Sequence, residues 1–216
     1  MERKKDLNNL YRIIFIYLIF TVGIIGHLYS PLRELMIKLT PYTLLITGMV
    51  VFFEAFADRN NYLLYWGVIT YILTFTLEAI GVNSGLIFGN YTYGKTLGFS
   101  VFNVPLIIGF NWVLVILGAV GITQIFYKNI FLHSFFSALL AVIFDFILEP
   151  IAIRLDYWNW QNNVIPVQNY IAWFIIAFIA SLIFYKLKVK IKSSILIHYF
   201  FIQLIFFIIL LIFIKQ

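Results

Sequence analysis

The acidic residues inside apolar stretches are the residues of this sequence best suited to chemistry. Glu54, Glu78, Asp145 and Glu149 each lie within a run of mostly apolar residues, and Asp58 follows one turn after Glu54. An ionisable side chain in hydrocarbon is costly, so an acid at such a position is by default a functional candidate. We therefore predict catalytic roles for Glu54, Glu78, Asp145 and Glu149.

Two of these acids are spaced to act together. Asp145 and Glu149 are four residues apart and share one helix face. Pro150 follows at once, and because proline has no backbone N–H it is expected to kink or end the helix there. Two like charges so close do not readily both ionise, and burial acts in the same direction. The pair therefore predicts a neutral acid that can donate a proton in an apolar site. The alternative is that the acids only tie helices together, through Arg154, Asn or Tyr partners.

The elements that must position these acids are apolar runs of membrane-spanning length. Mean hydropathy is +0.98, and 11% of residues are charged, against about 25% in soluble domains. A spanning helix needs roughly 20 apolar residues. The sequence predicts an all-α, polytopic transmembrane bundle that forms a single domain over residues 1–216. About seven spans are expected, near Tyr11–Tyr29, Pro41–Ala57, Tyr62–Gly81, Val104–Tyr127, Phe131–Ile153, Asn169–Tyr185 and Ser194–Ile214.

Lysine and arginine in the connections predict the orientation, because these residues concentrate on the cytoplasmic side. With a cytoplasmic N-terminus, ten of the 15 lie inside: Arg3, Lys4, Lys5, Arg12, Arg59, Lys128, Lys186, Lys188, Lys190 and Lys192. We therefore expect a multi-pass protein of a prokaryotic cell membrane, with its N-terminus cytoplasmic and its C-terminus outside. Glu78, Asp145 and Glu149 then lie towards the outer leaflet, and Glu54 lies nearer the inner side.

Two long connections then lie outside, and they predict that function sits on that side. Residues 83–103 are rich in glycine and tyrosine, and residues 155–168 contain Trp158 and Trp160. The alternative for these aromatic residues is an interfacial belt without a site. Gly89–Thr96 also matches the phosphate-loop pattern G-x-x-x-x-G-K-[ST]. That pattern needs a strand before it and a helix after it, so nucleotide binding is not expected here.

Several other classes of site and partner are not expected. The chain has no cysteine, which excludes disulfides, iron–sulfur clusters and thiol catalysis. His27, His133 and His198 fall in different spans, so we expect packing roles for them and no metal site. The basic residues lie at span ends rather than on one solvated face, so no nucleic-acid partner is expected.

The acids and loops together carry a resemblance to a known family. Residues 78–93 resemble the stretch E-x-x-G-V-x-x-G-x-x-F-G-x-Y-x-Y of a family of membrane carotenoid-biosynthesis proteins. Its further elements are similar to N-V-P followed by N-W at residues 103–112, D-x-x-x-E-P at 145–150, and W-x-W…P-x-x-N-x-x-x-W at 158–173. The resemblance covers nearly half of the chain. The family includes bisanhydrobacterioruberin hydratase and carotenoid 1,2-hydratases, which add water to the terminal double bond of an acyclic carotenoid.

The resemblance implies an acid-catalysed hydration that needs no cofactor. Protonation of a trisubstituted alkene gives a tertiary carbocation, which water attacks. We favour Asp145 as the proton donor, with Glu78 or Glu149 positioning the water. Aromatic ring faces would stabilise the cation. The residues expected to bind the substrate are Tyr91, Tyr93, Asn103, Asn111, Trp112, Trp158, Trp160, Asn169 and Trp173.

The expected partners are membrane lipid and a carotenoid that enters sideways from the bilayer. Association with other enzymes of the carotenoid pathway is a further hypothesis. Two other functions stay open. A lycopene-cyclase-like isomerase would also protonate a polyene end, but a neighbouring double bond would capture the cation. A small proton-coupled transporter would also place acids and glycine-broken segments inside the membrane. A purely structural membrane subunit is the third alternative.

Overall fold

A computed structural model describes residues 2–56, 61–189, 191 and 193–214. That part of the chain contains seven long helices, each with a stretch long and apolar enough to cross a membrane. They are α1 (Glu2–Leu28), α2 (Ser30–Phe56), α3 (Asn61–Ser84), α4 (Leu106–Phe126), α5 (Ile130–Arg154), α6 (Val167–Lys186) and α7 (Ile195–Phe213). The predicted all-α transmembrane bundle of about seven spans is confirmed.

Two helices run through a proline, one at an expected boundary and one at an expected kink or end. The second span was expected to begin at Pro41, but α2 begins at Ser30 and contains Pro41 in its interior. The expectation that Pro150 could end the helix was wrong, because α5 continues to Arg154. Neighbouring helices and polar side chains satisfy the backbone groups that a proline frees within a membrane bundle, so proline need not end a span. Asp58 lies outside the described residues.

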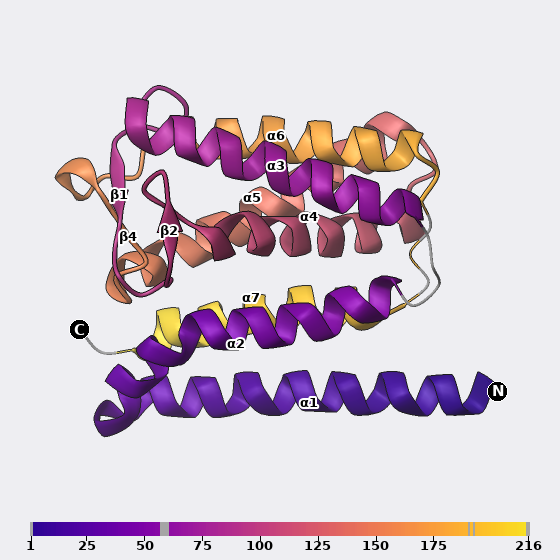
Figure 1. The fold of residues 1–216 in the computed structure, drawn as a ribbon, viewed down its shortest axis with the longest axis horizontal. Coiled ribbons are helices and arrows are strands. Elements are labelled where there is room, and N and C mark those ends of the chain that lie inside the picture. Colours follow the sequence, from indigo (N-terminus) through magenta and orange to yellow (C-terminus); the bar gives the residue numbers. More distant parts are fainter. Residues whose placement is uncertain (1, 57–60, 190, 192, 215–216) are drawn as a thin grey trace.

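The central helix of the bundle is α4. It packs against α2, α3, α5, α6 and α7, while α1 packs mainly on the outer pair α2 and α7 (Figure 1). This placement follows from composition, because α4 is apolar on all sides and a helix of that kind belongs in the interior. The most extensive helix pairing joins α5 and α6.

Short strands gather at one end of the bundle, which we call the loop end. The connection from α3 to α4 contains β1 (Tyr91–Tyr93), β2 (Ser100–Val101) and β3 (Val104–Pro105). The connection from α5 to α6 contains β4 (Trp158–Trp160) and the 3-10 helix η1 (Gln161–Asn163). β2 pairs with β3, and β1 pairs with β4 across the two connections, antiparallel in both cases. α1 begins at the opposite end, and α7 ends at the loop end (Figure 1).

Candidate active site

The β1–β4 ribbon directs four aromatic side chains to one side. Tyr91 pairs with Trp160, and Tyr93 pairs with Trp158. Successive side chains of a strand point to opposite faces, so these four share a face, and the middle residue of each strand takes the other. The middle residues are exposed, whereas Tyr91, Trp158 and Trp160 are buried and Tyr93 is half-buried. The ribbon therefore covers the end of the helix bundle with phenol and indole groups.

The two tyrosines of the ribbon bind Glu78. The hydroxyls of Tyr91 and Tyr93 both donate to Glu78 Oε2, the latter at 2.8 Å. Glu78 lies in α3 and is buried. Burial raises the pKa of Tyr91 and of Tyr93, and the neighbouring Glu78 carboxylate raises both further. The phenols therefore stay protonated near neutral pH and remain donors to Glu78.

The two tryptophans of the ribbon bind Glu149. Trp158 Nε1 donates to Glu149 Oε2 at 2.9 Å, and Trp160 Nε1 donates to the same oxygen at 2.8 Å. Asn169, near the start of α6, donates to Asp145 Oδ2 at 2.9 Å and to Glu149 Oε1 at 3.2 Å. Asp145 and Glu149 are both buried in α5. All the side chains that donate these hydrogen bonds to the three acids are neutral groups.

Two glycines allow the loops to approach closely enough to form this arrangement. Gly89 has φ 106°, and a Cβ there would lie 2.5 Å from Pro166 Cγ. A Cβ on Gly94 would lie 2.1 Å from the backbone oxygen of Asp156. Both glycines belong to the stretch that matches the phosphate-loop pattern. Here that stretch contains strand β1, which the structure uses to hold tyrosines against Glu78.

A small cavity lies at the centre of these contacts. Its volume is about 20 Å³, which is about the room that one water molecule needs. Among the described residues, no group of three or more His, Asp or Glu side chains is arranged to hold a metal ion. The cavity is lined by Glu78, Tyr91, Tyr93, Ile108, Trp112, Asp145, Glu149, Trp158, Trp160, Asn169 and Trp173.

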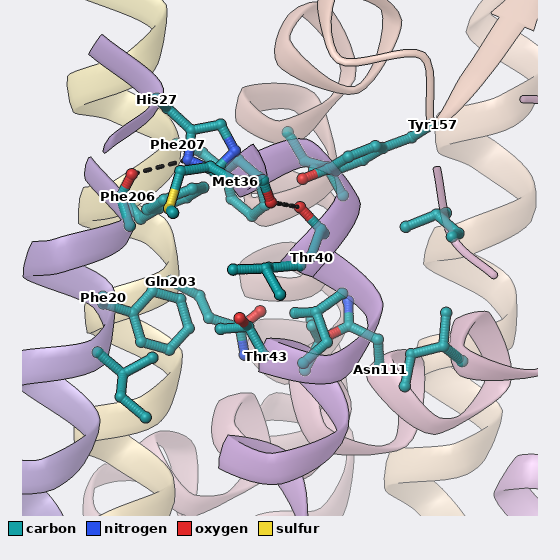
Figure 2. Close-up of a pocket in the computed structure, with 18 of the residues that line it drawn as sticks. Phe20, His27, Met36, Thr40, Thr43, Asn111, Tyr157, Gln203, Phe206 and Phe207 are labelled. Atoms are coloured by element: carbon teal, nitrogen blue, oxygen red, sulfur yellow. Dashed lines mark hydrogen bonds between the residues drawn. The ribbon is translucent and has the colours of Figure 1, made fainter. Parts of the chain in front are cut away.

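A larger cavity adjoins the small one (Figure 2). It measures about 260 Å³ and is lined by side chains of α1, α2, α4, α5 and α7 and of the loop end. Most of these side chains are apolar. Ile108, Trp112 and Trp158 line both cavities, so the two spaces share a wall. The volume is near the lower limit for small-molecule sites, about 300 Å³, and suits one end of a long ligand.

Helix α5 contributes side chains to both cavities, from residues that are neighbours in the sequence. Asp145 and Glu149 line the small cavity, and the residues just before them, Phe144 and Leu148, line the larger one. The helix thus places the acids beside an apolar space without exposing them to bulk solvent.

The larger cavity reaches the outer surface of the helix bundle. Leu18 and Val22 of α1 and Leu39 of α2 line it, and these side chains are 59%, 52% and 40% exposed. They belong to helices of membrane-spanning length and composition, so the surface they form faces lipid.

Trp112 of the shared wall belongs to a stack of aromatic rings. The rings of Trp112 and Trp173 are stacked, with centroids 3.4 Å apart and an interplanar angle of 16°. Phe88 stacks on Trp173 at 5.2 Å. The stack fixes the orientation of the Trp112 indole, which lines both cavities.

Comparison with known proteins decides the family. Residues 39–215 match the family described as carotenoid biosynthesis protein, which is well over half of the chain. The chain belongs to this family. The match includes the three acids of the loop end, both strands of the ribbon, α2 from residue 39 onward and all of α3 to α7. The chain matches no curated protein and no solved structure.

Three of the predicted residues of this carotenoid biosynthesis protein lie away from the acids. Glu54 is buried near the end of α2, at the opposite end of the bundle, where it forms an ion pair with Arg12. Asn103 is exposed, and its side-chain amide donates to Asn83 Oδ1 at 2.8 Å. Asn111 lines the larger cavity rather than the small one. The other ten predicted residues all line the small cavity.

Most of the residues that line the larger cavity were not predicted from the sequence. His27, Gln203 and Tyr157 line it, from α1, from α7 and from the residues just before β4. Burial raises the pKa of Tyr157 to about 12, although a hydrogen bond with Thr40 opposes the shift. One signal was available for Gln203, since it is a carboxamide in a helix of mostly apolar residues.

Proposed function

We propose that this carotenoid biosynthesis protein adds water to the terminal double bond of an acyclic carotenoid end, by acid catalysis. The observation that carries the proposal is the shared wall between the two cavities. One cavity gathers three buried acids around room for about one water, and the other suits an apolar chain end. A hydration of an alkene needs these two compartments side by side.

The chemistry assigns a role to each acid. Asp145, as the neutral acid, gives its proton to the less substituted carbon of the double bond, and the tertiary carbon becomes cationic. Water then attacks this carbon, and Glu149 or Glu78 takes the proton that the water loses. Asn169 bridges Asp145 and Glu149, so one residue orients both carboxyls. Proton transfer between the carboxyls restores the starting state, and the net change is the addition of one water.

The aromatic wall serves the cationic intermediate. Ile108, Trp112 and Trp158 separate the bound chain end from the acids, so a rotation of one indole would join the two spaces. The indole of Trp112, which lines both cavities, would then lie near the positive charge and stabilise it. The preorganised carboxyls would act in a site from which bulk water is excluded.

We propose further that the carotenoid enters from the bilayer and that the N-terminus is cytoplasmic. The lipid-facing residues Leu18, Val22 and Leu39 support entry of the carotenoid from the bilayer. The distribution of lysine and arginine supports a cytoplasmic N-terminus, which would place the loop end and the acids towards the outside.

Pigment analysis tests the proposal. The protein would be expressed in a bacterial host that accumulates lycopene and its elongated derivatives, and the pigments would be resolved by chromatography and mass spectrometry. A more polar pigment, heavier by one water, supports hydration. A new pigment of unchanged mass would instead identify a cyclase. If folded protein is present in the membrane and no carotenoid gives a new pigment, both the hydratase and the cyclase are contradicted and a transporter is favoured. Proton-linked solute uptake into sealed vesicles would then test for transport.

A further inference from the structure

A shallow groove runs along the outer face of α1, outside both cavities. Its volume is about 490 Å³. Leu18 and Val22 line the groove and also the larger cavity, so the groove begins where that cavity reaches the surface. Because α1 lies at the edge of the bundle, the groove opens to lipid (Figure 1). The groove is lined by Ile13, Ile14, Tyr17, Leu18, Thr21 and Val22 of α1 and by His198 of α7.

The hydroxyl groups in this groove already have partners within the chain. The hydroxyl of Tyr17 is hydrogen-bonded to His198 Nδ1 at 3.1 Å, and the hydroxyl of Thr21 donates to the backbone oxygen of Tyr17 at 2.8 Å. The other residues of α1 that line the groove are aliphatic. A hydrocarbon can therefore lie over the groove without leaving either hydroxyl unsatisfied.

The larger cavity has room for only part of an acyclic carotenoid. Its volume is about 260 Å³, which is below the range of about 300 to 1,000 Å³ for sites that enclose a drug-sized ligand. A carotenoid is a stiff, conjugated chain that is much longer than such a ligand. When its end occupies the cavity, the rest of the chain must leave through the opening, which Leu18 and Val22 line. These two residues are also where the groove begins.

We propose that the groove on α1 binds the conjugated middle of the carotenoid whose end fills the larger cavity. From Val22 to Ile13 the groove follows α1 for roughly 14 Å, away from the loop end. The bound chain would therefore lie across the membrane, with its second end directed to the opposite side. The inference rests on the proposed function for the identity of the ligand. It goes further by stating that the protein recognises the length of the polyene as well as its end.

A stiff polyene suits this groove better than the lipid tails that compete for it. Lipid tails are as apolar as the groove, so the hydrophobic effect favours neither ligand. A flexible acyl chain loses conformational freedom when it is held straight, whereas a conjugated chain is already extended and loses less. The groove should therefore bind the carotenoid in preference to the surrounding tails.

The test compares a long and a short hydrocarbon on the full chain in lipid nanodiscs. The long probe is lycopene, which is achiral, so visible circular dichroism above that of empty nanodiscs reports its binding in an asymmetric site. The short probe is farnesene, which matches a chain end and is measured by displacement of lycopene in the same assay. We expect lycopene to bind at least fivefold more tightly than farnesene, because only lycopene reaches the groove.

Two variants locate this preference. Ile14→Trp and Thr21→Trp each place an indole in the groove, and we expect each to weaken lycopene at least fivefold while leaving the affinity for farnesene unchanged. Ile25→Trp is the matched control, because Ile25 is 61% exposed on the same helix and lines neither the groove nor the larger cavity. Equal affinities for the two probes, or a preference for lycopene that survives both variants, would overturn the inference. An equal loss in the control variant would also overturn it.

Failure of this inference and failure of the proposed function give different results. Groove-dependent binding of lycopene without any hydrated pigment would keep the groove and reject the hydratase. A hydrated pigment, with lycopene binding that ignores both groove variants, would do the reverse. Asp145→Asn separates them further, because it should abolish hydration while leaving the dichroism of bound lycopene intact.

Discussion

Buried acids occur at both ends of this bundle, but they have different partners. Glu54 lies against the guanidinium of Arg12, a cation that balances its charge. Glu78, Asp145 and Glu149 at the loop end receive hydrogen bonds from phenol, indole and amide groups, which are neutral. An ion pair holds a carboxylate in its charged form, whereas clustered acids with neutral donors can share a proton. The partner, rather than the depth in the membrane, therefore distinguishes Glu54 from the three acids for which we propose a catalytic role.

The largest effect is expected at the proton donor. Asp145→Asn keeps the shape of the side chain and removes the acidic proton, so product formation should fall by about 10²- to 10⁴-fold. Pigment quantification in the lycopene-producing host measures the change, and immunoblotting of membranes controls for the amount of protein. Full activity in this variant would assign the proton to another acid and break the distinction between the two ends.

The next effect concerns the residue that joins two acids. Asn169→Leu removes the amide that donates to both Asp145 and Glu149, and should lower the free energy of unfolding by about 2 kcal/mol. Thermal unfolding in detergent would measure it. The control is Asn159→Ala in β4, an exposed residue whose amide donates to Asp156 Oδ1 at 3.0 Å in solvent, which should change stability by about 0.5 kcal/mol or less. Equal effects would show that the bridge is energetically unimportant.

A pH effect is expected from Tyr157, which lines the larger cavity. Its pKa is about 12 in the fold and about 10 in an unfolded chain. Below pH 10 the phenol is neutral in both states and its contribution is complete. Between pH 10 and 12 mainly the unfolded state loses the proton, so stability falls, by about 1.4 kcal/mol at pH 11. Tyr157→Phe should flatten the stability profile in that range, and an unchanged slope would contradict the assignment.

The smallest effect is expected at the opposite end of the bundle. Glu54→Gln removes the charge that Arg12 faces and should cost about 1 kcal/mol or less, since the Arg12 side chain is 44% exposed. Pigment composition should not change, because Glu54 lies far from both cavities. A hydration rate that fell as far as in Asp145→Asn would place Glu54 in the mechanism and remove the contrast between the two regions.

The sequence alone determined the spans, the spacing of Asp145 and Glu149, and the family. Hydropathy predicts a membrane helix because a run of roughly 20 apolar residues is long enough to cross the hydrocarbon layer. A four-residue spacing places two residues on the same helix face. The recurring Y-x-Y and W-x-W patterns also indicated aromatic residues near the acids. These features are local along the chain, so no knowledge of the packing was needed to find them.

Only the tertiary structure decided which of these features meet. The pairing of Tyr91 with Trp160 joins two connections that are far apart in the sequence, and it brings Glu78 of α3 to the acids of α5. The same packing left Glu54 at the other end and built the larger cavity from α1, α2 and α7. The rotation and contacts of apolar helices depend on side-chain packing between spans, and a hydropathy pattern that is apolar on every face does not specify them.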